Sequence, residues 1–210
     1  MFFSRLISPS AITATLFVIF PVSAIGQSVS LIGTELSLRT QLQLTPTSEL
    51  VVSPFPASEI VSETEVEFPD VESLFGGDPV PPGFGGIANV AIDAGADFLE
   101  IDFANSAPDF QFASAFQNTY VFTFDSAIAL QITDATIDDS VTTLGLTPDR
   151  LDFAGNELFI NVQSLTFNPT TFARINLNAT AVPEPSSCAL LFGVGMAILT
   201  RRRRRTTNGT

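Results

Sequence analysis

The chain has 210 residues and a formal net charge of −13, with nine arginines, one cysteine and neither lysine nor histidine. Without imidazole it lacks the side chains for a serine–histidine or cysteine–histidine nucleophile pair and for an imidazole zinc site. A surface this acidic repels nucleic acid. We therefore expect a protein that is not an enzyme and does not bind nucleic acid.

The first 26 residues have the three parts of a secretory signal peptide. Arg5 supplies the positive charge, residues 11–22 are apolar, and small residues follow at 22–26. Pro21 interrupts a helix just before the small residues, which favours cleavage over the alternative of an uncleaved anchor. The prediction is a cleavable signal peptide at 1–26 and an exported chain.

Residues 27–181 form the predicted exported domain. This segment holds three arginines (Arg39, Arg150 and Arg174) and 21 of the 22 acidic residues, so its formal charge is −18. It contains no cysteine, hence no disulfide, and its stability must come from a hydrophobic core. Its length suits one domain. The acidic surface suits high ionic strength or the attraction of divalent cations within a polysaccharide matrix; the alternative is an ordinary solvated surface.

Apolar and polar residues alternate along much of this domain, which predicts strands with one buried face. In the stretch 60–68 we expect Val66 and Phe68 to face inward and Glu67 outward. Residues 127–132 are expected to return beside 120–124 after a turn, and Ala154-Gly155-Asn156 predicts a hairpin. The predicted strands cover residues 36–44, 60–68, 99–103, 120–124, 127–132, 151–153, 157–162 and 173–177.

Residues 69–86 are rich in proline and glycine and predict a long surface loop, in preference to a linker between two domains. No part of residues 27–181 has a clear helical period. Short strands separated by turn residues are typical of an all-β fold, and we predict an antiparallel β-sandwich or jelly roll.

Two acidic clusters are candidate calcium sites, because calcium prefers oxygen ligands. Neither has the spacing of an EF-hand, and solvated loop acids are the alternative in both places. No other cofactor is predicted. The clusters are Asp93, Asp97 and Glu100, and Asp134, Asp138 and Asp139.

The acids also leave open a carboxylate pair for glycoside cleavage. The chain has no tryptophan and one tyrosine, so side chains on which sugars stack are scarce. A carbohydrate-binding or carbohydrate-active secreted module is therefore the rival prediction to a non-enzymatic protein.

Residues 182–210 form a tail with three parts. Two prolines in the segment 182–186 enforce an extended backbone. Residues 187–200 predict a short transmembrane helix; its uncharged part from Cys188 spans about 20 Å, against about 30 Å for a bilayer core. Residues 201–205 are five arginines that stay cytoplasmic. A plain bitopic membrane protein is a further alternative.

This order of parts resembles the PEP-CTERM sorting signal of Gram-negative bacteria. The extra residues 206–210 depart from the usual pattern. The resemblance implies that exosortase, an integral-membrane cysteine protease, removes the tail. The residues that carry the resemblance are Val182, Pro183, Glu184 and Pro185, followed by Arg201, Arg202, Arg203, Arg204 and Arg205.

The same resemblance implies a surface or exopolysaccharide-matrix protein with a structural or adhesive role. The expected route is an inner-membrane intermediate, held by the carboxyl-terminal helix before processing, and then the cell envelope, cell surface or extracellular matrix. Exosortase is the expected processing partner, and a surface or matrix polysaccharide is the candidate ligand.

Overall fold

The computed structural model describes residues 28–75 and 87–182. The predicted signal peptide, most of the proline- and glycine-rich loop and the tail from Pro183 onward lie outside the described residues. The described part is built from antiparallel strands. Its helical segments are two single turns of 3₁₀ helix, η1 (Ser73–Phe75) and η2 (Pro148–Arg150). The all-β prediction is confirmed, and no helix in these ranges is long and apolar enough to cross a bilayer.

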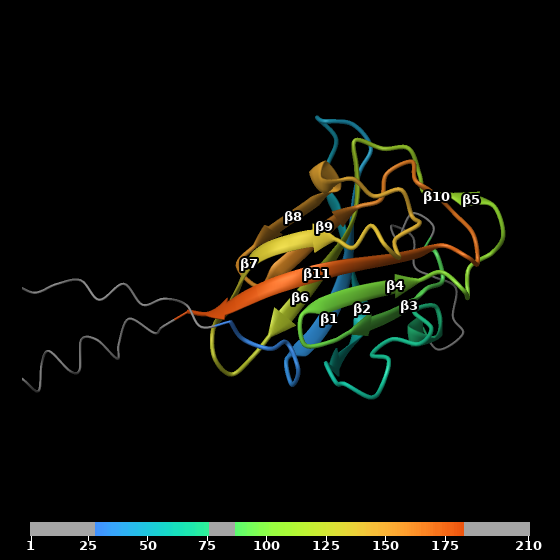
Figure 1. Cartoon of the computed structure of the whole chain (residues 1–210). Helices are drawn as coiled ribbons and strands as arrows, with labels where there is room; N and C mark the ends of the chain where they lie inside the picture. Colours follow the sequence, from blue (N-terminus) through green and yellow to red (C-terminus); the bar gives the residue numbers. More distant parts are fainter. Residues whose placement is uncertain (1–27, 76–86, 183–210) are drawn as a thin grey trace, which may run out of the picture.

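The strands form two main sheets and one small one (Figure 1). The five-stranded sheet has the order β2 (Val51–Ile60), β1 (Glu35–Gln43), β6 (Gln117–Asp125), β9 (Glu157–Asn161), β8 (Leu151–Ala154). The four-stranded sheet has the order β3 (Ala91–Ala94), β4 (Phe98–Asp102), β11 (Phe172–Ala181), β7 (Leu130–Ile137). Strands β5 (Phe110–Gln111) and β10 (Thr166–Phe167) pair separately.

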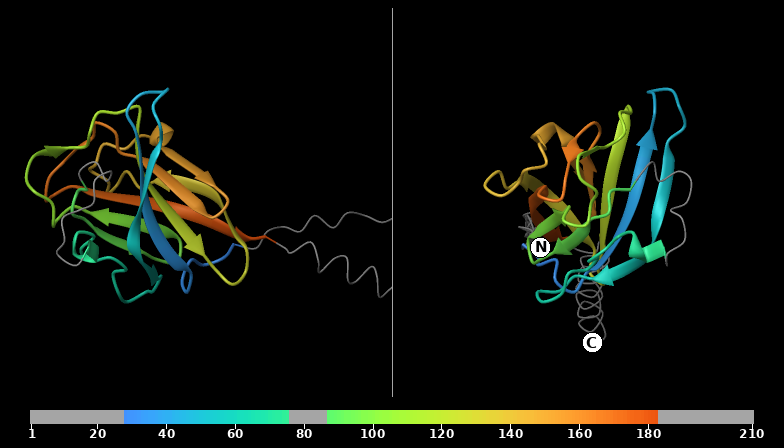
Figure 2. Two further views of the ribbon diagram at one scale, coloured as in Figure 1. Left: turned by 180° about the vertical axis from the view of Figure 1, so that it is seen from behind. Right: turned by 90° about the vertical axis from the view of Figure 1, so that its right-hand side faces the viewer.

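The hydrophobic core lies between the two main sheets, which form separate layers in the views of Figure 2. Both layers contribute fully buried side chains, as the alternation in each strand predicts. This arrangement is consistent with the predicted β-sandwich. Examples are Leu36, Phe122 and Leu158 from one sheet and Leu99, Ile101 and Ile175 from the other.

Several local predictions are confirmed. Strands β8 and β9 form the expected hairpin, and Gly155 in its turn has a φ of 61°, a left-handed conformation that glycine adopts without a steric penalty. The buried faces of β4 and β11 are those predicted. On β6 both faces are buried: Val121, which alternates with Tyr120 and Phe122, is also fully buried and pairs with Arg39 and Phe159 on the neighbouring strands.

The strand predicted at 60–68 is wrong. Residues 61–67 form a loop in which Val66 is 45% exposed and Glu67 only 7% exposed, the reverse of the predicted faces. The strand lies earlier, as β2, and contains Pro54 and Pro56. Prolines are tolerated there because β2 is an edge strand, where a missing N–H is not needed for a second neighbour.

The predicted pairing of residues 127–132 with 120–124 is also wrong. Strand β7 begins at Leu130 and pairs with β11 in the opposite sheet. It contacts the five-stranded sheet at the β8–β9 turn, where the Ile132 N–H donates to the carbonyl oxygen of Gly155 at 2.7 Å. Alternation identifies a strand but not its partner, so a crossover between the layers gives the same local pattern as a hairpin.

Candidate functional site

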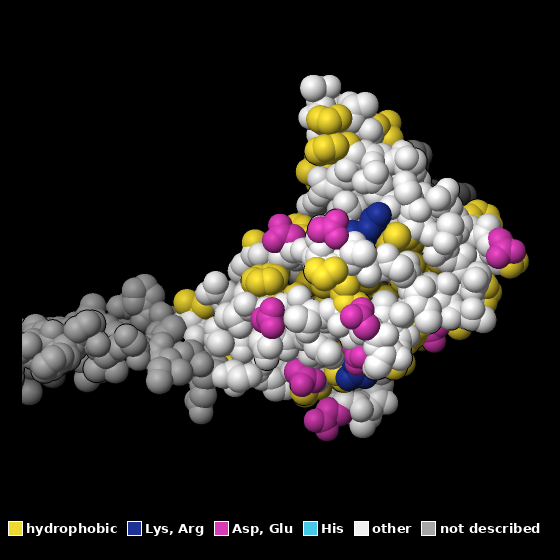
Figure 3. Space-filling view, turned by 45° about the horizontal axis from the view of Figure 1, so that its top comes forward, with side chains coloured by type: hydrophobic (Ala, Val, Ile, Leu, Met, Phe, Trp, Pro, Cys, Tyr) yellow, Lys and Arg dark blue, Asp and Glu magenta, His cyan; other side chains and the backbone are white. Residues whose placement is uncertain are grey.

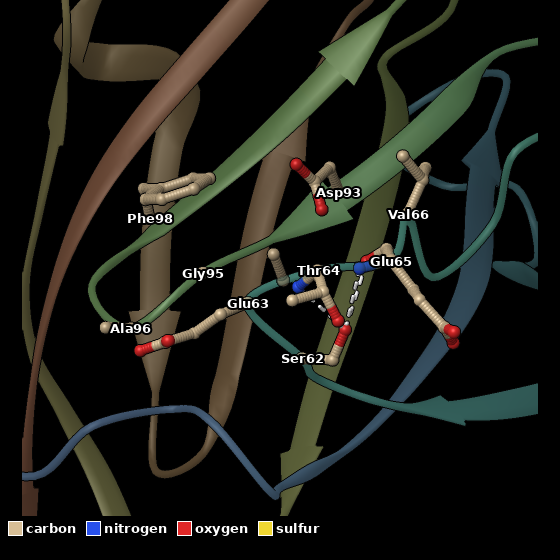
Figure 4. Close-up of a pocket in the computed structure, with 10 residues that line it drawn as sticks. Ser62, Glu63, Thr64, Glu65, Val66, Asp93, Gly95, Ala96 and Phe98 are labelled. Atoms are coloured by element: carbon tan, nitrogen blue, oxygen red, sulfur yellow. Dashed lines mark hydrogen bonds between the residues drawn. The ribbon is translucent and has the colours of Figure 1, made fainter.

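A pocket of about 410 Å³ lies between the loop that follows β2 and the turn between β3 and β4 (Figure 4). Among residues 28–75 and 87–182, its walls carry three carboxylates and one aromatic ring, and no basic side chain. The lining residues named in Figure 4 are Ser62, Glu63, Thr64, Glu65, Val66, Asp93, Gly95, Ala96 and Phe98.

A buried carboxylate holds the two sides of this pocket together. The Glu67 Oε1 accepts the backbone N–H of Ser62 at 2.8 Å, and its Oε2 accepts the backbone N–H of Ala94 at 2.6 Å. Burial raises the pKa of Glu67, and the charge of Asp93 raises it further. These two bonds explain why a glutamate that periodicity assigns to the surface turns inward.

The aromatic ring of the pocket is engaged within the fold. The Arg174 guanidinium carbon lies 4.0 Å from the ring centroid of Phe98, a cation–π contact. Gly95 lies so close that an added Cβ would come within 2.1 Å of the ring. The pocket therefore offers carboxylates more readily than a free face on which a sugar ring could stack.

Arg174 brings together one member of each acidic cluster that was a calcium candidate. Its Nη1 donates to Glu100 at 2.7 Å, and its Nε lies 4.0 Å from Asp138 Oδ2. Asp93 lies opposite Glu100 in the β3–β4 register, and Asp97 is exposed in the turn.

In the second cluster, Asp134 is exposed and contacts Asn178, and Asp139 is exposed. Within residues 28–75 and 87–182, no three acidic, histidine or cysteine side chains lie close enough together to hold a metal ion.

The other two arginines of the domain also bind within it. Arg39 makes a bidentate ion pair with Glu157, at 2.8 and 2.9 Å, and donates to Thr123 Oγ1 at 3.0 Å. Arg150 donates to the backbone carbonyls of Asn161 and Gln163 at 3.1 and 2.9 Å. All three arginines of the described chain are thus used internally. Figure 3 shows the arginine atoms of the visible face beside acidic side chains, while further carboxylates are spread over that face.

The Arg39–Glu157 pair makes stability depend on pH. The hydrogen bond from Arg39 lowers the pKa of Glu157, so its contribution is present above the ordinary value of 4.5 and is lost as the pH falls through the folded pKa. We expect Glu157→Gln to lower the free energy of unfolding by about 1 kcal/mol at pH 7. The ion pair is bidentate, which strengthens it, but it is partly exposed to solvent, which weakens it. Urea unfolding of residues 28–182 at pH 7 and pH 3 measures this.

The difference between wild type and Glu157→Gln should shrink at pH 3, because this pH lies below the ordinary glutamate pKa of 4.5, and protonation of Glu157 in the unfolded chain then offsets the contribution of the ion pair. Glu63→Gln is the matched control, because Glu63 is exposed and makes no ion pair with any arginine among the described residues. A gap of equal size at both pH values would contradict the assignment of this effect to the ion pair.

The predicted sorting segment begins directly after β11. Val182 is described: its backbone N–H donates to the carbonyl oxygen of Ala129 at 2.8 Å, directly after β11. Pro183, Glu184, Pro185 and the arginines 201–205 lie outside the described residues. At the other end, Ser28 forms a β-bridge with Thr180. The two ends of the described chain, Ser28 and Val182, therefore lie at the same end of the sandwich (Figure 1).

Comparison with known proteins identifies this segment. Residues 181–205 match the PEP-CTERM protein-sorting motif. No curated protein and no solved structure matches the chain significantly. The motif implies export, processing by exosortase and sorting to the cell envelope. The chain therefore carries a PEP-CTERM sorting motif at residues 181–205, which confirms the resemblance predicted from the order of its parts.

Proposed function

We propose that the mature domain is a non-enzymatic, structural or adhesive component of the cell surface or of an exopolysaccharide matrix. The observation that carries the proposal is the sorting motif at 181–205, which begins on the last strand of one acidic β-sandwich. Such a chain delivers a single folded module to the envelope, and its surface chemistry then decides what it binds there.

The charges of the domain support a role in a hydrated, cation-containing matrix. Its three arginines bind inside the fold, at Glu157, at Glu100 and at backbone carbonyls. The surplus carboxylates are left to attract divalent cations, which in turn bind acidic polysaccharide. The proposal places the interaction on this diffuse acidic surface, with cations between protein and polymer.

The absence of histidine and lysine from the sequence supports a non-enzymatic role, since the common nucleophile pairs need them. The acidic pocket near Glu63 and Asp93 is the observation that favours a second candidate, a carbohydrate-binding or carbohydrate-active module. In that case neutral sugars would bind in the pocket without added cations.

The experiment expresses the full chain in an exosortase-containing host and follows it into the exopolysaccharide fraction. We expect the mature protein to sediment with isolated exopolysaccharide when calcium or magnesium is present, to be released by a chelator, and to generate no new reducing ends. If the protein still sediments with exopolysaccharide in the presence of the chelator, and Asp93→Asn abolishes this, the result would favour sugar binding in the pocket. New reducing ends, absent without the protein, would overturn the non-enzymatic proposal.

A further inference from the structure

The last residue of β11, Ala181, is also the first residue of the sorting motif. The motif begins at residue 181, and Ala181 is still paired with Leu130 of β7. Val182 then donates its N–H to the carbonyl oxygen of Ala129 at 2.8 Å. The first two residues of the motif therefore have partners inside the domain.

The amino-terminal segment supports the same strand from its other side. Ser28 bridges Thr180, and the Val29 N–H donates to the carbonyl oxygen of Ala179 at 2.9 Å. At Ala179 and Thr180 the strand is thus held between β7 and this segment. Beyond Thr180, Ala181 pairs with Leu130 and Val182 donates its N–H to Ala129, the residue before β7.

We infer that this pairing is a gate for processing: exosortase reads the start of the motif only after Ala181 and Val182 separate from Ala129 and Leu130. The inference rests on the processing of this tail by exosortase. Extended peptides are bound through their backbone groups. A Val182 N–H that donates to Ala129 is not available to the protease, so the folded strand and the protease compete for the same residues.

The segment between Val182 and the uncharged run is too short to avoid this competition. Only residues 183–187 separate Val182 from the uncharged run that begins at Cys188. Five residues span at most about 18 Å when fully extended. With that run in the membrane, the folded end is held close to the bilayer. Release of Ala181 and Val182 adds roughly 7 Å of free chain, so it improves reach as well as access.

A disulfide across the gate tests the inference. Leu130 and Ala181 are a non-hydrogen-bonded pair, because the adjoining bond joins Val182 to Ala129. Such pairs hold their Cα atoms about 4.5 Å apart, which a disulfide can bridge. The full chain with Leu130→Cys and Ala181→Cys, in a Cys188→Ser background, is incubated with exosortase-containing membranes in its oxidised and reduced forms.

We expect the oxidised form to be processed at least tenfold more slowly than the reduced form of the same chain. The reduced form should be processed at least as fast as the Cys188→Ser chain, which is run with and without reductant as the control for the protease. Equal processing rates for the oxidised and reduced forms would overturn the inference that strand pairing limits processing. If the Cys188→Ser chain itself is never trimmed, it is the sorting function that fails.

A second variant opens the gate without a new covalent bond. Insertion of Gly-Ser-Gly-Ser after Thr180 moves Ala181 and Val182 out of the sheet while Thr180 keeps its bridge to Ser28. We expect processing to become severalfold faster. The same insertion after Thr47, in the loop between β1 and β2, is the control and should leave the rate unchanged. Slower processing of the chain extended after Thr180 would overturn the inference, since the protease would then require the paired strand end.

Discussion

Replacing Pro183, Glu184 and Pro185 together by alanine is expected to leave export intact and to abolish removal of the tail. The physical reason is that the two prolines fix an extended backbone, the conformation that a protease binds, and alanine does not. The full-length form should then accumulate at the inner membrane. Mass spectrometry of fractionated cells with exosortase measures the mass and location of the protein.

The five arginines provide a matched comparison. Replacing Arg201 to Arg205 by serine removes the positive charge that keeps the end of the tail cytoplasmic, so uncleaved chains should pass into the periplasm instead of accumulating in the membrane. The two variants therefore differ in location as well as in mass. An alanine variant that is trimmed and released like wild type would contradict the sorting role of the three residues.

The largest loss of stability is expected from Phe122→Ala in the middle of β6. The Phe122 side chain is fully buried between the sheets, and its ring lies 6.4 Å from that of Tyr120. Truncation leaves a cavity and should lower the free energy of unfolding by about 3–5 kcal/mol. Urea unfolding of residues 28–182, followed by circular dichroism, measures the change.

Phe116→Ala is the control, because Phe116 is 53% exposed and its backbone bond to Leu44 survives the substitution. Its cost should be below about 0.5 kcal/mol. If the two variants lost similar stability, the core would not lie between the layers as described. A spectrum of the wild-type domain dominated by helix would contradict the fold itself.

The strands that the sequence predicts well are those in which the alternating apolar residues are the ones that the tertiary structure buries. Leu36 and Leu38 on β1, and Ala173 and Ile175 on β11, alternate with polar residues and are buried as expected. The β8–β9 hairpin was predictable because its turn and both strands lie within a few residues. In these places interactions between residues close in sequence determine the secondary structure.

The errors arise where tertiary contacts override the pattern. Glu67 turns inward because backbone N–H groups of Ser62 and Ala94 pair with it, and Ala94 is 27 residues away in sequence. Pro54 and Pro56 argue against a strand in the sequence, but both lie in β2, which tolerates them because it is an edge strand. Neither arrangement has a local signal, so periodicity assigns the strand to the wrong residues.

The sorting motif and the acidic pocket differ in the same way. A linear motif can be recognised from consecutive residues, and 181–205 was identified without knowledge of the fold. The pocket joins the loop around Glu63 to the turn around Asp93, which only the structure brings together. The overlap of the motif with β11 was equally invisible, because it depends on the pairing of Ala181 with Leu130.

The position of β11 also determines how the domain bears tension. This strand of ten residues runs between β4 and β7, spans about 33 Å, and continues into the segment that leaves the sandwich. A pull on Val182 acts along the strand, at right angles to its hydrogen bonds, and loads those bonds together in shear. A molecule held at Val182 and pulled by a ligand at the far end would therefore resist through all hydrogen bonds of the strand at once, whereas a pull across the sheet would break them one at a time.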